Sequence, residues 1–271
     1  MFTNQYVGFI GGGAIAEALI RGILQAGLLQ PAQILVNDVN ENRRAFLEAS
    51  YGVTAIADSQ LLVAKADILF LTVKPNVVEP LLTTIAKAIL PQTIVVSVAA
   101  GVRLAALEEK LPNNPIIRVM PNTPVAVGEG MSVLALGSRS CSEHGEKAAA
   151  LFNAVGKTVM AGEELMDAVT GLSGSGPGYA FVLIDALADA GVRVGLPRQM
   201  SILLAAQTLL GAAKMVLETG EHPAKLRDAV TSPGGTTIAG IHVMEQRGVR
   251  AALSDAVAVA CERSREMGKR K

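Results

Sequence analysis

A glycine-rich turn near the start of the chain has the residues needed to hold a pyrophosphate. Residues 6–17 read YVGFIGGGAIAE, an apolar run followed by Gly11-x-Gly13-x-x-Ala16 and then by helix-forming residues. Gly11 allows a tight turn, Gly13 lets a pyrophosphate approach the backbone, and Ala16 keeps the helix close to the strand. The first N–H groups of that helix would face the phosphates. The pattern predicts a dinucleotide site, with a merely tight strand-to-helix turn as the alternative.

A second candidate for chemistry is TSPGGTTIAG at 231–240, which interrupts Ala-, Leu- and Met-rich helical sequence. We expect Pro233 to end the preceding helix, while Gly234 and Gly235 allow backbone conformations closed to other residues. A new helix is expected from about Thr236, and its unpaired N–H groups suit a carboxylate. Because Ser and Thr are also ordinary helix caps, both anion binding and simple capping fit this spacing.

Three further strand ends carry small residues or prolines: TVKP at 72–75, SVAAG at 97–101 and MPNTP at 120–124. Ligands of open α/β sheets bind beyond the carboxyl ends of the strands, so these exits are expected to form a binding rim. The small residues of 99–101 would let a nicotinamide lie flat against the backbone. Lys74 would pair with a phosphate or, equally well, with a protein carboxylate.

The residues after the second predicted strand leave the type of dinucleotide open. Asp38 favours NADH, because an acid there bonds the adenosine ribose hydroxyls and repels a 2′-phosphate. Asn37 would serve either cofactor. Arg43 and Arg44 favour NADPH, because either could reach a 2′-phosphate.

Side chains used for nucleophilic or metal chemistry are sparse. The chain has two cysteines, Cys141 and Cys261, and three histidines, none in metal-ligand spacing, so a reduced, cytoplasmic, metal-free protein is expected. A net charge of zero argues against a nucleic-acid binder. The apolar stretch 201–217 contains Gln207 and Lys214, so we expect it to be buried in protein and not to span a membrane.

The elements that would position these residues fall into two halves. Apolar runs at 6–10, 34–37, 67–73, 93–98, 116–120, 132–136 and 157–160 alternate with amphipathic stretches. Strands without polar alternation are buried on both faces, which predicts a mostly parallel sheet covered by helices, with antiparallel pairing at its far edge. The fold class is therefore α/β, with an N-terminal Rossmann-type sheet domain over residues 1–162.

From residue 163 the patterns are helical only, and several helices are apolar around most of their circumference. Such helices must be covered on all sides, so we predict an all-α C-terminal dimerisation domain over 163–271. A monomer that packs these helices on its own sheet domain is the alternative. GLSGSGPGYAF (171–181) is expected to be the second glycine break of the helical domain, with Ser175 as the N-cap and Pro177 in the first helical turn. Simple capping and a pocket wall fit this stretch equally well.

Six motifs, in order, resemble the pyrroline-5-carboxylate reductase family over nearly the whole chain: GFIGGGAIAEAL, FLTVKP, SVAAGV, RVMPNTP, TGLSGSGPGYAF and TSPGGTTIAGI. The resemblance implies a Rossmann domain and a helical domain that interlocks with its twin in a homodimer, often within a ring of dimers. It also implies an oxidoreductase that reduces the C=N bond of 1-pyrroline-5-carboxylate to L-proline with NADPH or NADH, the last step of proline biosynthesis. A protonated imine is already electrophilic, so this reaction needs no catalytic His or Cys.

The resemblance also implies the site residues. Thr237 is the catalytic hydroxyl beside the ring nitrogen. The cofactor-binding residues are Gly11, Gly12, Gly13, Ala14, Ile15, Ala16, Asn37, Asp38, Ser59, Val73, Lys74, Pro75, Ala99, Ala100 and Gly101. The substrate-binding residues are Met120, Pro121, Asn122, Ser232, Gly234, Gly235, Thr236 and Thr237. No metal ligand is implied.

Two positions depart from the family pattern. Ser59 stands where many relatives have Asn near the cofactor ribose, and Asp38 is not universal, so the usual NADPH preference does not follow. The alternatives are a related imine or β-hydroxy-acid reductase, and a non-catalytic dinucleotide-sensing regulator of the same fold. The hydroxy-acid enzymes need a lysine base, but Lys214 and Lys225 lie outside glycine-rich motifs. A sensor would have no use for a carboxylate site.

Overall fold

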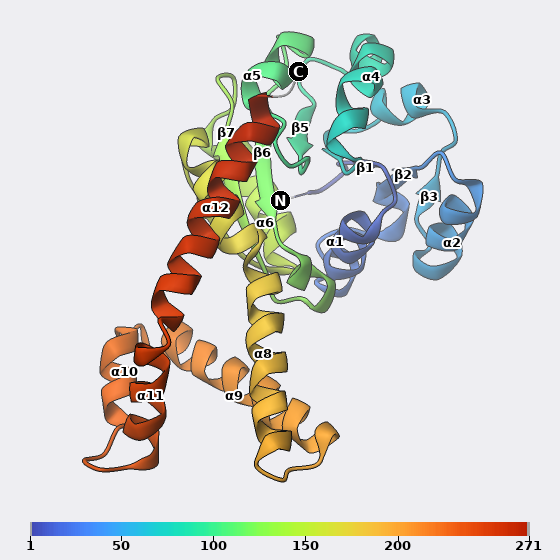
Figure 1. Cartoon of the computed structure of the whole chain (residues 1–271). Coiled ribbons are helices and arrows are strands. Elements are labelled where there is room, and N and C mark those ends of the chain that lie inside the picture. Colours follow the sequence, from blue (N-terminus) through green and yellow to red (C-terminus); the bar gives the residue numbers. More distant parts are fainter. Residues whose placement is uncertain (1, 270–271) are drawn as a thin grey trace. The chain divides into compact units, whose positions relative to one another are not determined.

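The computed structural model of the protein describes residues 2–269 and contains one eight-stranded sheet followed by helices (Figure 1). The strands lie in the order β3-β2-β1-β4-β5-β6-β7-β8. They are β1 (Val7–Ile10), β2 (Ile34–Asn37), β3 (Thr54–Ala55), β4 (Ile68–Leu71), β5 (Ile94–Ser97), β6 (Ile116–Pro121), β7 (Gly130–Leu136) and β8 (Gly156–Met160). Residues 270–271 of the predicted second domain lie outside the described residues.

The pairing of the strands confirms the α/β fold class. The strands from β3 through β6 are all parallel to their neighbours, and β7 runs antiparallel to β6. The antiparallel pairing at the far edge is therefore confirmed, although β8 returns to a parallel pairing with β7. Because the first six strands in space are parallel, their carboxyl ends meet at a single edge of the sheet.

Helices cover both faces of this sheet, as its apolar strands require. One core cluster joins alternate strand residues to α1 (Ala14–Gln25), α2 (Glu41–Tyr51) and α6 (Ser142–Asn153). The other joins the opposite strand residues to α3 (Ser59–Val63), α4 (Pro75–Ile85) and α5 (Leu104–Lys110). Phe9 and Phe70 stack in the first cluster, with ring centroids 4.8 Å apart. The shorter 3-10 segments are η1 (Pro31–Gln33), η2 (Ala86–Ala88) and η3 (Thr123–Val127).

The chain forms two compact units, and the long last helix contributes to both. The sheet unit runs to Ser175 and also contains the part of α12 (Val249–Lys269) from Val259 onward. The helical unit spans Gly176–Ala258. The change of sequence pattern at 162 therefore does not coincide with the division into compact units.

A short π-helical turn replaces the cap expected at Ser175. The segments η4 (Glu163–Leu165), α7 (Met166–Val169) and η5 (Thr170–Gly174) run directly into α8 (Gly176–Arg193). Ser175 has helical φ and ψ of −84° and −18°, and its N–H donates to the Thr170 carbonyl over 2.9 Å. The N-cap prediction was wrong, because the helix continues through this glycine-rich stretch with one wide turn.

The helical unit leaves most of its apolar side chains exposed in the single chain. Its other helices are α9 (Arg198–Thr219), α10 (Pro223–Ala229) and α11 (Thr236–Gln246). Only Ser201 and Ala205 are buried on α9, and no residue of α11 is buried. The burial expected for 201–217 is therefore not provided by the chain's own described residues. By length and composition alone, α9 is also apolar enough to cross a membrane, a property shared with helices that a protein partner covers.

Candidate active site

Hydrogen bonds join the carboxyl ends of four neighbouring strands into one rim. The Gly11 N–H donates to the Asn37 carbonyl over 2.8 Å, which links β1 to β2. The Thr72 N–H donates to the Ile10 carbonyl over 2.9 Å, and the Thr72 hydroxyl lies 2.6 Å from the Gly11 carbonyl oxygen. The Val98 N–H donates to the Leu71 carbonyl over 3.2 Å, which extends the rim to β5. Thr72 lies in the predicted TVKP exit, but its bond to Gly11 was missed, because nothing local marks a threonine that bonds a turn 61 residues away.

The three consecutive glycines of the turn occupy different surroundings. Gly11 has φ of +96°, and a Cβ there would lie 2.8 Å from the Thr72 carbonyl oxygen. A Cβ on Gly12 would lie 2.7 Å from a methyl group of Leu47. A Cβ on Gly13 would meet nothing within 4 Å, so this side of the turn is open space.

The open space lies at the start of α1, where a phosphate would be held. Gly13 is the N-cap of α1 and receives no side-chain cap. The first N–H groups of the helix, from Ala14 to Ala16, have no intrahelical acceptors and carry the positive end of the helix dipole. The turn thus fits the pyrophosphate of a dinucleotide: the glycine with a free approach is the one whose backbone the ligand must reach.

Asp38 and Asn37 hold the backbone of the rim in place. The Asp38 carboxylate accepts the Gly12 N–H over 2.8 Å and the Asn40 N–H over 2.9 Å. The buried Asn37 amide donates to the carbonyls of Ile56 and Ala57, each over 2.8 Å. These bonds fix the Asp38 carboxylate beside the glycine turn and tether the loop that leads to Ser59, the first residue of α3.

Of the two arginines after β2, Arg43 forms an ion pair and Arg44 bonds only a backbone carbonyl. The Arg43 guanidinium is paired with the Glu17 carboxylate and also donates from Nε to the Gly12 carbonyl. Arg44 donates from Nη1 to the Asp38 carbonyl over 2.7 Å, and no described carboxylate pairs with it. The pKa of Glu17 is held below its usual range chiefly by the hydrogen bond from Arg43. The pairing of Glu17 with Arg43 had no signal in the sequence.

The exits of β4 and β5 present the other predicted cofactor residues. Val73 follows Thr72, Lys74 is the N-cap of α4 and Pro75 is its first residue. Lys74 is exposed and makes no ion pair with a described carboxylate, so the protein-carboxylate alternative is not realised here. Ala99 is buried, and Ala100 is followed by Gly101 with φ of +76°. Pro75 and Gly101 line a cavity of 760 Å³ that extends between α4 and α5.

The end of β6 is tied to the π-helical turn by Asn122. Its Nδ2 lies 3.2 Å from the Ser173 carbonyl oxygen and 3.4 Å from the Ser173 hydroxyl, and its Oδ1 accepts the Met131 N–H over 2.9 Å. Met120 faces Gly174, where a Cβ would lie 2.6 Å from the Met120 methyl group, and Pro121 is buried. The Asn122 side chain is thus occupied by protein bonds on both its donor and its acceptor side.

The TSPGGTT loop lies in the helical unit and opens α11. Gly234 has φ of +67°, Gly235 is the extended N-cap without a side-chain cap, and α11 begins at Thr236 as predicted. The Gly235 N–H donates to the Ser232 carbonyl over 3.0 Å. Pro233 does not end the preceding helix, since α10 already ends at Ala229, and the prediction was wrong by four residues.

Three of the four hydroxyls in the TSPGGTT loop have no partner within the described part of the chain, whereas the Thr231 hydroxyl donates to the Arg227 carbonyl over 2.7 Å. Ser232, Thr236 and Thr237 are exposed, and their hydroxyls have no hydrogen-bond partner among residues 2–269. A threonine that only capped a helix would bond the helix backbone. Free hydroxyls beside an uncapped helix start are chemically suited to an anion or a polar ring atom.

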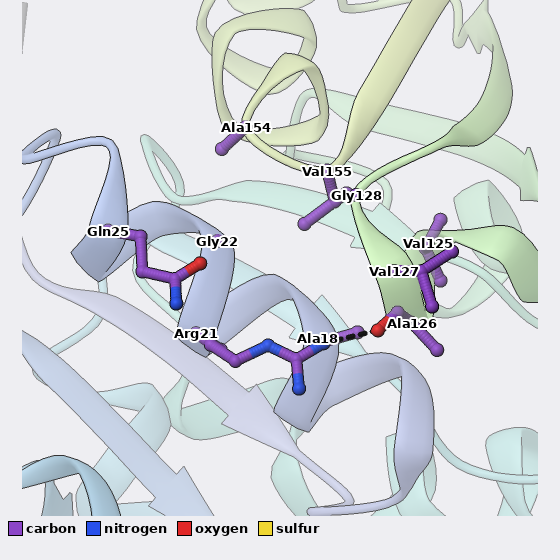
Figure 2. Close-up of a pocket in the computed structure, with 10 residues that line it drawn as sticks. All are labelled: Ala18, Arg21, Gly22, Gln25, Val125, Ala126, Val127, Gly128, Ala154 and Val155. Atoms are coloured by element: carbon purple, nitrogen blue, oxygen red, sulfur yellow. Dashed lines mark hydrogen bonds between the residues drawn. The ribbon is translucent and has the colours of Figure 1, made fainter.

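Two further observations concern other sites in the described residues. A separate cavity of 360 Å³ lies between the later part of α1, η3 and the turn before β8, and its arginine, Arg21, donates to the Ala126 carbonyl (Figure 2). None of the predicted site residues lines it. Within residues 2–269, no group of three or more His, Cys, Asp or Glu side chains is placed to hold a metal ion.

Comparisons with known proteins agree with both halves of this arrangement. Residues 163–267 match the family model for pyrroline-5-carboxylate reductase dimerisation, and residues 6–101 match the model for NADP oxidoreductase, coenzyme F420-dependent. A pyrroline-5-carboxylate reductase of Arabidopsis thaliana is 50% identical over 96% of this chain and 95% of its own length. The chain belongs to the pyrroline-5-carboxylate reductase family. A member from Methanosarcina acetivorans is 46% identical over 98% of this chain and 99% of its own length.

The fold of this chain is also similar to solved structures of the family. A pyrroline-5-carboxylate reductase from Coxiella burnetii has a TM-score of 0.93 at 32% identity, covering 98% of this chain and 99% of that chain. A pyrroline carboxylate reductase from Plasmodium falciparum, solved with NADP bound, has a TM-score of 0.88 at 30% identity, covering 99% of this chain and 100% of that chain.

Proposed function

We propose that this protein reduces the C=N bond of 1-pyrroline-5-carboxylate to L-proline with NADPH or NADH, as the last step of proline biosynthesis. The observation that carries the proposal is the near full-length likeness to pyrroline-5-carboxylate reductases, 50% identical over 96% of the chain for the Arabidopsis protein. The open space at Gly13 and the free hydroxyls at Ser232–Thr237 support it from the chemistry of the two candidate half-sites.

The cofactor half of the site is assigned to the rim of the sheet. The N–H groups of Gly13–Ala16 bind the pyrophosphate, and Asn37, Asp38 and Ser59 surround the adenosine ribose. Further contacts come from Val73–Pro75, and the small residues Ala99–Gly101 give the nicotinamide a flat wall. A bound nicotinamide dinucleotide supplies the hydride, and the chain supplies binding and orientation.

Two separate segments are assigned to the substrate: the TSPGGTT loop of the helical unit and, in the sheet unit, Met120–Asn122. The first N–H groups of α11 and the hydroxyls of Ser232 and Thr236 bind the substrate carboxylate. The Thr237 hydroxyl accepts a hydrogen bond from the protonated ring nitrogen and so holds the iminium in its reactive orientation. Gly234 and Gly235 shape the loop, and Met120–Asn122 provide a wall whose position the Asn122 bonds fix.

The division of labour follows the predicted domains. Residues 1–162 form the dinucleotide-binding domain, and residues 163–271 form the substrate-binding and dimerisation domain. The exposed apolar surface of α8, α9 and α11 pairs with a second copy in a cytoplasmic homodimer, and dimers assemble further into a ring. In that assembly α9 is covered by protein and does not enter a membrane. The protein has no nucleic-acid partner.

A single assay separates this function from its alternatives. NADPH or NADH absorbance at 340 nm should fall when 1-pyrroline-5-carboxylate is added and should not fall with a β-hydroxy acid's keto counterpart. A dinucleotide-sensing regulator would bind either cofactor without turnover. Absence of turnover with both cofactors would contradict the proposal.

The role of Thr237 can be measured with the variant Thr237→Val, which keeps the shape and removes the hydroxyl. Loss of a hydrogen bond to a charged group lowers kcat/KM for 1-pyrroline-5-carboxylate by about tenfold or more, because such a bond contributes roughly 1.5–3 kcal/mol. Dinucleotide affinity, measured by fluorescence quenching, should stay within about twofold. Ser138→Ala, a change at an exposed loop of the sheet unit, serves as control. An unchanged kcat/KM in Thr237→Val would reduce Thr237 to a structural residue.

A further inference from the structure

Beneath the glycine turn, Glu17 and Arg43 join the first two helices of the sheet unit. Arg43 on α2 pairs with Glu17 in the first turn of α1, and Tyr51 donates its hydroxyl to the other oxygen of Glu17 over 2.8 Å. The Arg43 guanidinium also donates from Nε to the Gly12 carbonyl and lies 5.0 Å from the centroid of the Phe46 ring. We name these three side chains, Glu17, Arg43 and Tyr51, the clasp.

We propose that Glu17 is a specificity-determining residue, which sets the preference between NADPH and NADH by neutralising the charge of Arg43 beside the adenosine ribose. The inference rests on the proposed function for the reaction itself, although its central test needs only binding. Neither the glycine fingerprint nor the acid after β2 requires a carboxylate at position 17.

Arg43 is close enough to the ribose position to matter. Gly12 lies between the two groups, since its N–H bonds the Asp38 carboxylate and its carbonyl accepts from Arg43. A Cβ on Gly12 would be 3.5 Å from both Arg43 Cγ and Asp38 Oδ2. An acid at the Asp38 position meets the 2′-hydroxyl of NADH, whereas an arginine nearby meets the 2′-phosphate of NADPH. The clasp therefore holds one of two candidate phosphate-binding cations right beside the acid.

The charges around this corner decide which cofactor is favoured. Asp38 is a fixed negative charge, Arg44 is a cation with no described ion-pair partner, and Arg43 is neutralised by Glu17. The side chains of Arg43 and Glu17 are only 25% and 26% exposed, so water screens their pairing less than at a free surface. Without the Glu17 charge, Arg43 keeps its place and gains a net positive charge for a 2′-phosphate.

Glu17 is ionised at neutral pH, and its lowered pKa keeps it ionised in more acidic solution as well. The hydrogen bond from Arg43 is the main cause of this shift, and the bond from Tyr51 acts in the same direction. Because the carboxylate is ionised at neutral pH, cofactor selection there does not depend on protonation of position 17. The preference between NADPH and NADH instead depends on the negative charge of Glu17, which the isosteric substitution Glu17→Gln removes.

The test compares Glu17→Gln with the wild type in binding adenosine 2′,5′-bisphosphate and adenosine 5′-monophosphate by isothermal titration calorimetry. The variant should bind the bisphosphate about fivefold to tenfold more tightly, with the monophosphate affinity unchanged within about twofold. Tyr51→Phe is the matched control, because it removes a bond to the same carboxylate but leaves the charge. The ratio of bisphosphate affinity to monophosphate affinity should therefore stay constant in this variant. In an Arg43→Met background, Glu17→Gln should no longer change the ratio by more than about twofold.

Three results would overturn the inference. Glu17→Gln could change the affinities for both nucleotides by the same factor, or it could change neither affinity. It could also tighten bisphosphate binding as much in the Arg43→Met background as in the wild type. Turnover gives a second readout, because the ratio of kcat/KM for NADPH over NADH should rise in Glu17→Gln by a similar factor. If neither cofactor supports turnover while the binding ratio shifts, the proposed function fails and the role of Glu17 stands. If the protein turns over 1-pyrroline-5-carboxylate but the cofactor ratio does not shift in Glu17→Gln, the proposed function stands and the role of Glu17 fails.

Discussion

Gly11, Gly12 and Gly13 are the same residue type, and only their surroundings show which glycine the fold needs and which the ligand needs. Gly11 is required by its φ of +96° and by the Thr72 carbonyl, and Gly12 is enclosed by Leu47. Gly13 has φ of −67° and open space, so the folded chain itself makes no demand for glycine there. Its requirement for glycine comes from the approach of a pyrophosphate to the backbone.

This difference predicts opposite outcomes for Gly13→Ala and Gly11→Ala. Gly13→Ala should change the free energy of unfolding by less than about 1 kcal/mol, because the new methyl group meets no protein atom. It should weaken NADH and NADPH binding by about tenfold or more, because the methyl group occupies the ligand's place. Gly11→Ala should lower the free energy of unfolding by about 1–3 kcal/mol, because a side chain is strained at positive φ.

Chemical denaturation and dinucleotide titration of the two variants measure both effects. Gly27→Ala is a useful reference, since Gly27 also has positive φ but no atom within 4 Å of its would-be Cβ. It reports the cost of the backbone conformation without a steric clash. Undiminished dinucleotide binding by Gly13→Ala would show that the pyrophosphate does not lie at this turn.

At the scale of elements, the buried strands were predictable and the short or locally unusual elements were not. The run ILVN was predicted and found at Ile34–Asn37, because burial on both faces leaves a continuous apolar signal. The edge strand β3 has two residues, of which Thr54 is exposed, and so carries no such pattern. The π-helical turn at Thr170–Gly174 was read as a helix break, since glycine propensity does not distinguish a wide turn from a cap.

The candidate site divides in the same way. Motif residues such as Gly11 and Gly13 are visible in sequence because each has a local backbone reason to be glycine. Thr72, Glu17 and Asn122 are recognised or reinterpreted only in the fold, because their partners are distant in the chain. Asn122 is predicted as a substrate residue, and its bonds to Ser173 and Met131 add a second role, a connection between β6, β7 and the π-helical turn.

Asn122→Asp should reveal this connecting role. The carboxylate still accepts the Met131 N–H, but it cannot donate to the Ser173 carbonyl, which then faces a negative oxygen. The free energy of unfolding should fall by about 1–3 kcal/mol, as for a partly buried hydrogen bond whose acceptor is left unpaired. Asn113→Asp, an exposed change of the same type, should stay within about 0.5 kcal/mol. Equal stability of the two variants in urea titrations would argue against the connection.

At the scale of the whole molecule, the helical unit is incomplete as a single chain. Large apolar side chains on its helices are about half to two-thirds exposed: Phe181 65%, Val182 69%, Leu203 68%, Leu210 56%, Leu217 64% and Val243 52%. A monomer would leave all of these large apolar side chains in water. The match of residues 163–267 to a dimerisation model supports homo-oligomerisation, which removes this surface from water.

Leu203→Glu on α9 should separate the subunits. A charge placed in an apolar interface must be desolvated without a partner, which costs several kcal/mol at each of two symmetric positions. Sedimentation velocity at about micromolar concentration should therefore show the wild type as a dimer or larger assembly and the variant as a monomer. Leu90→Glu introduces the same charge at a 42% exposed leucine of the sheet unit and should leave the assembly unchanged. A Leu203→Glu variant that sediments like the wild type would place the subunit interface elsewhere than on α9.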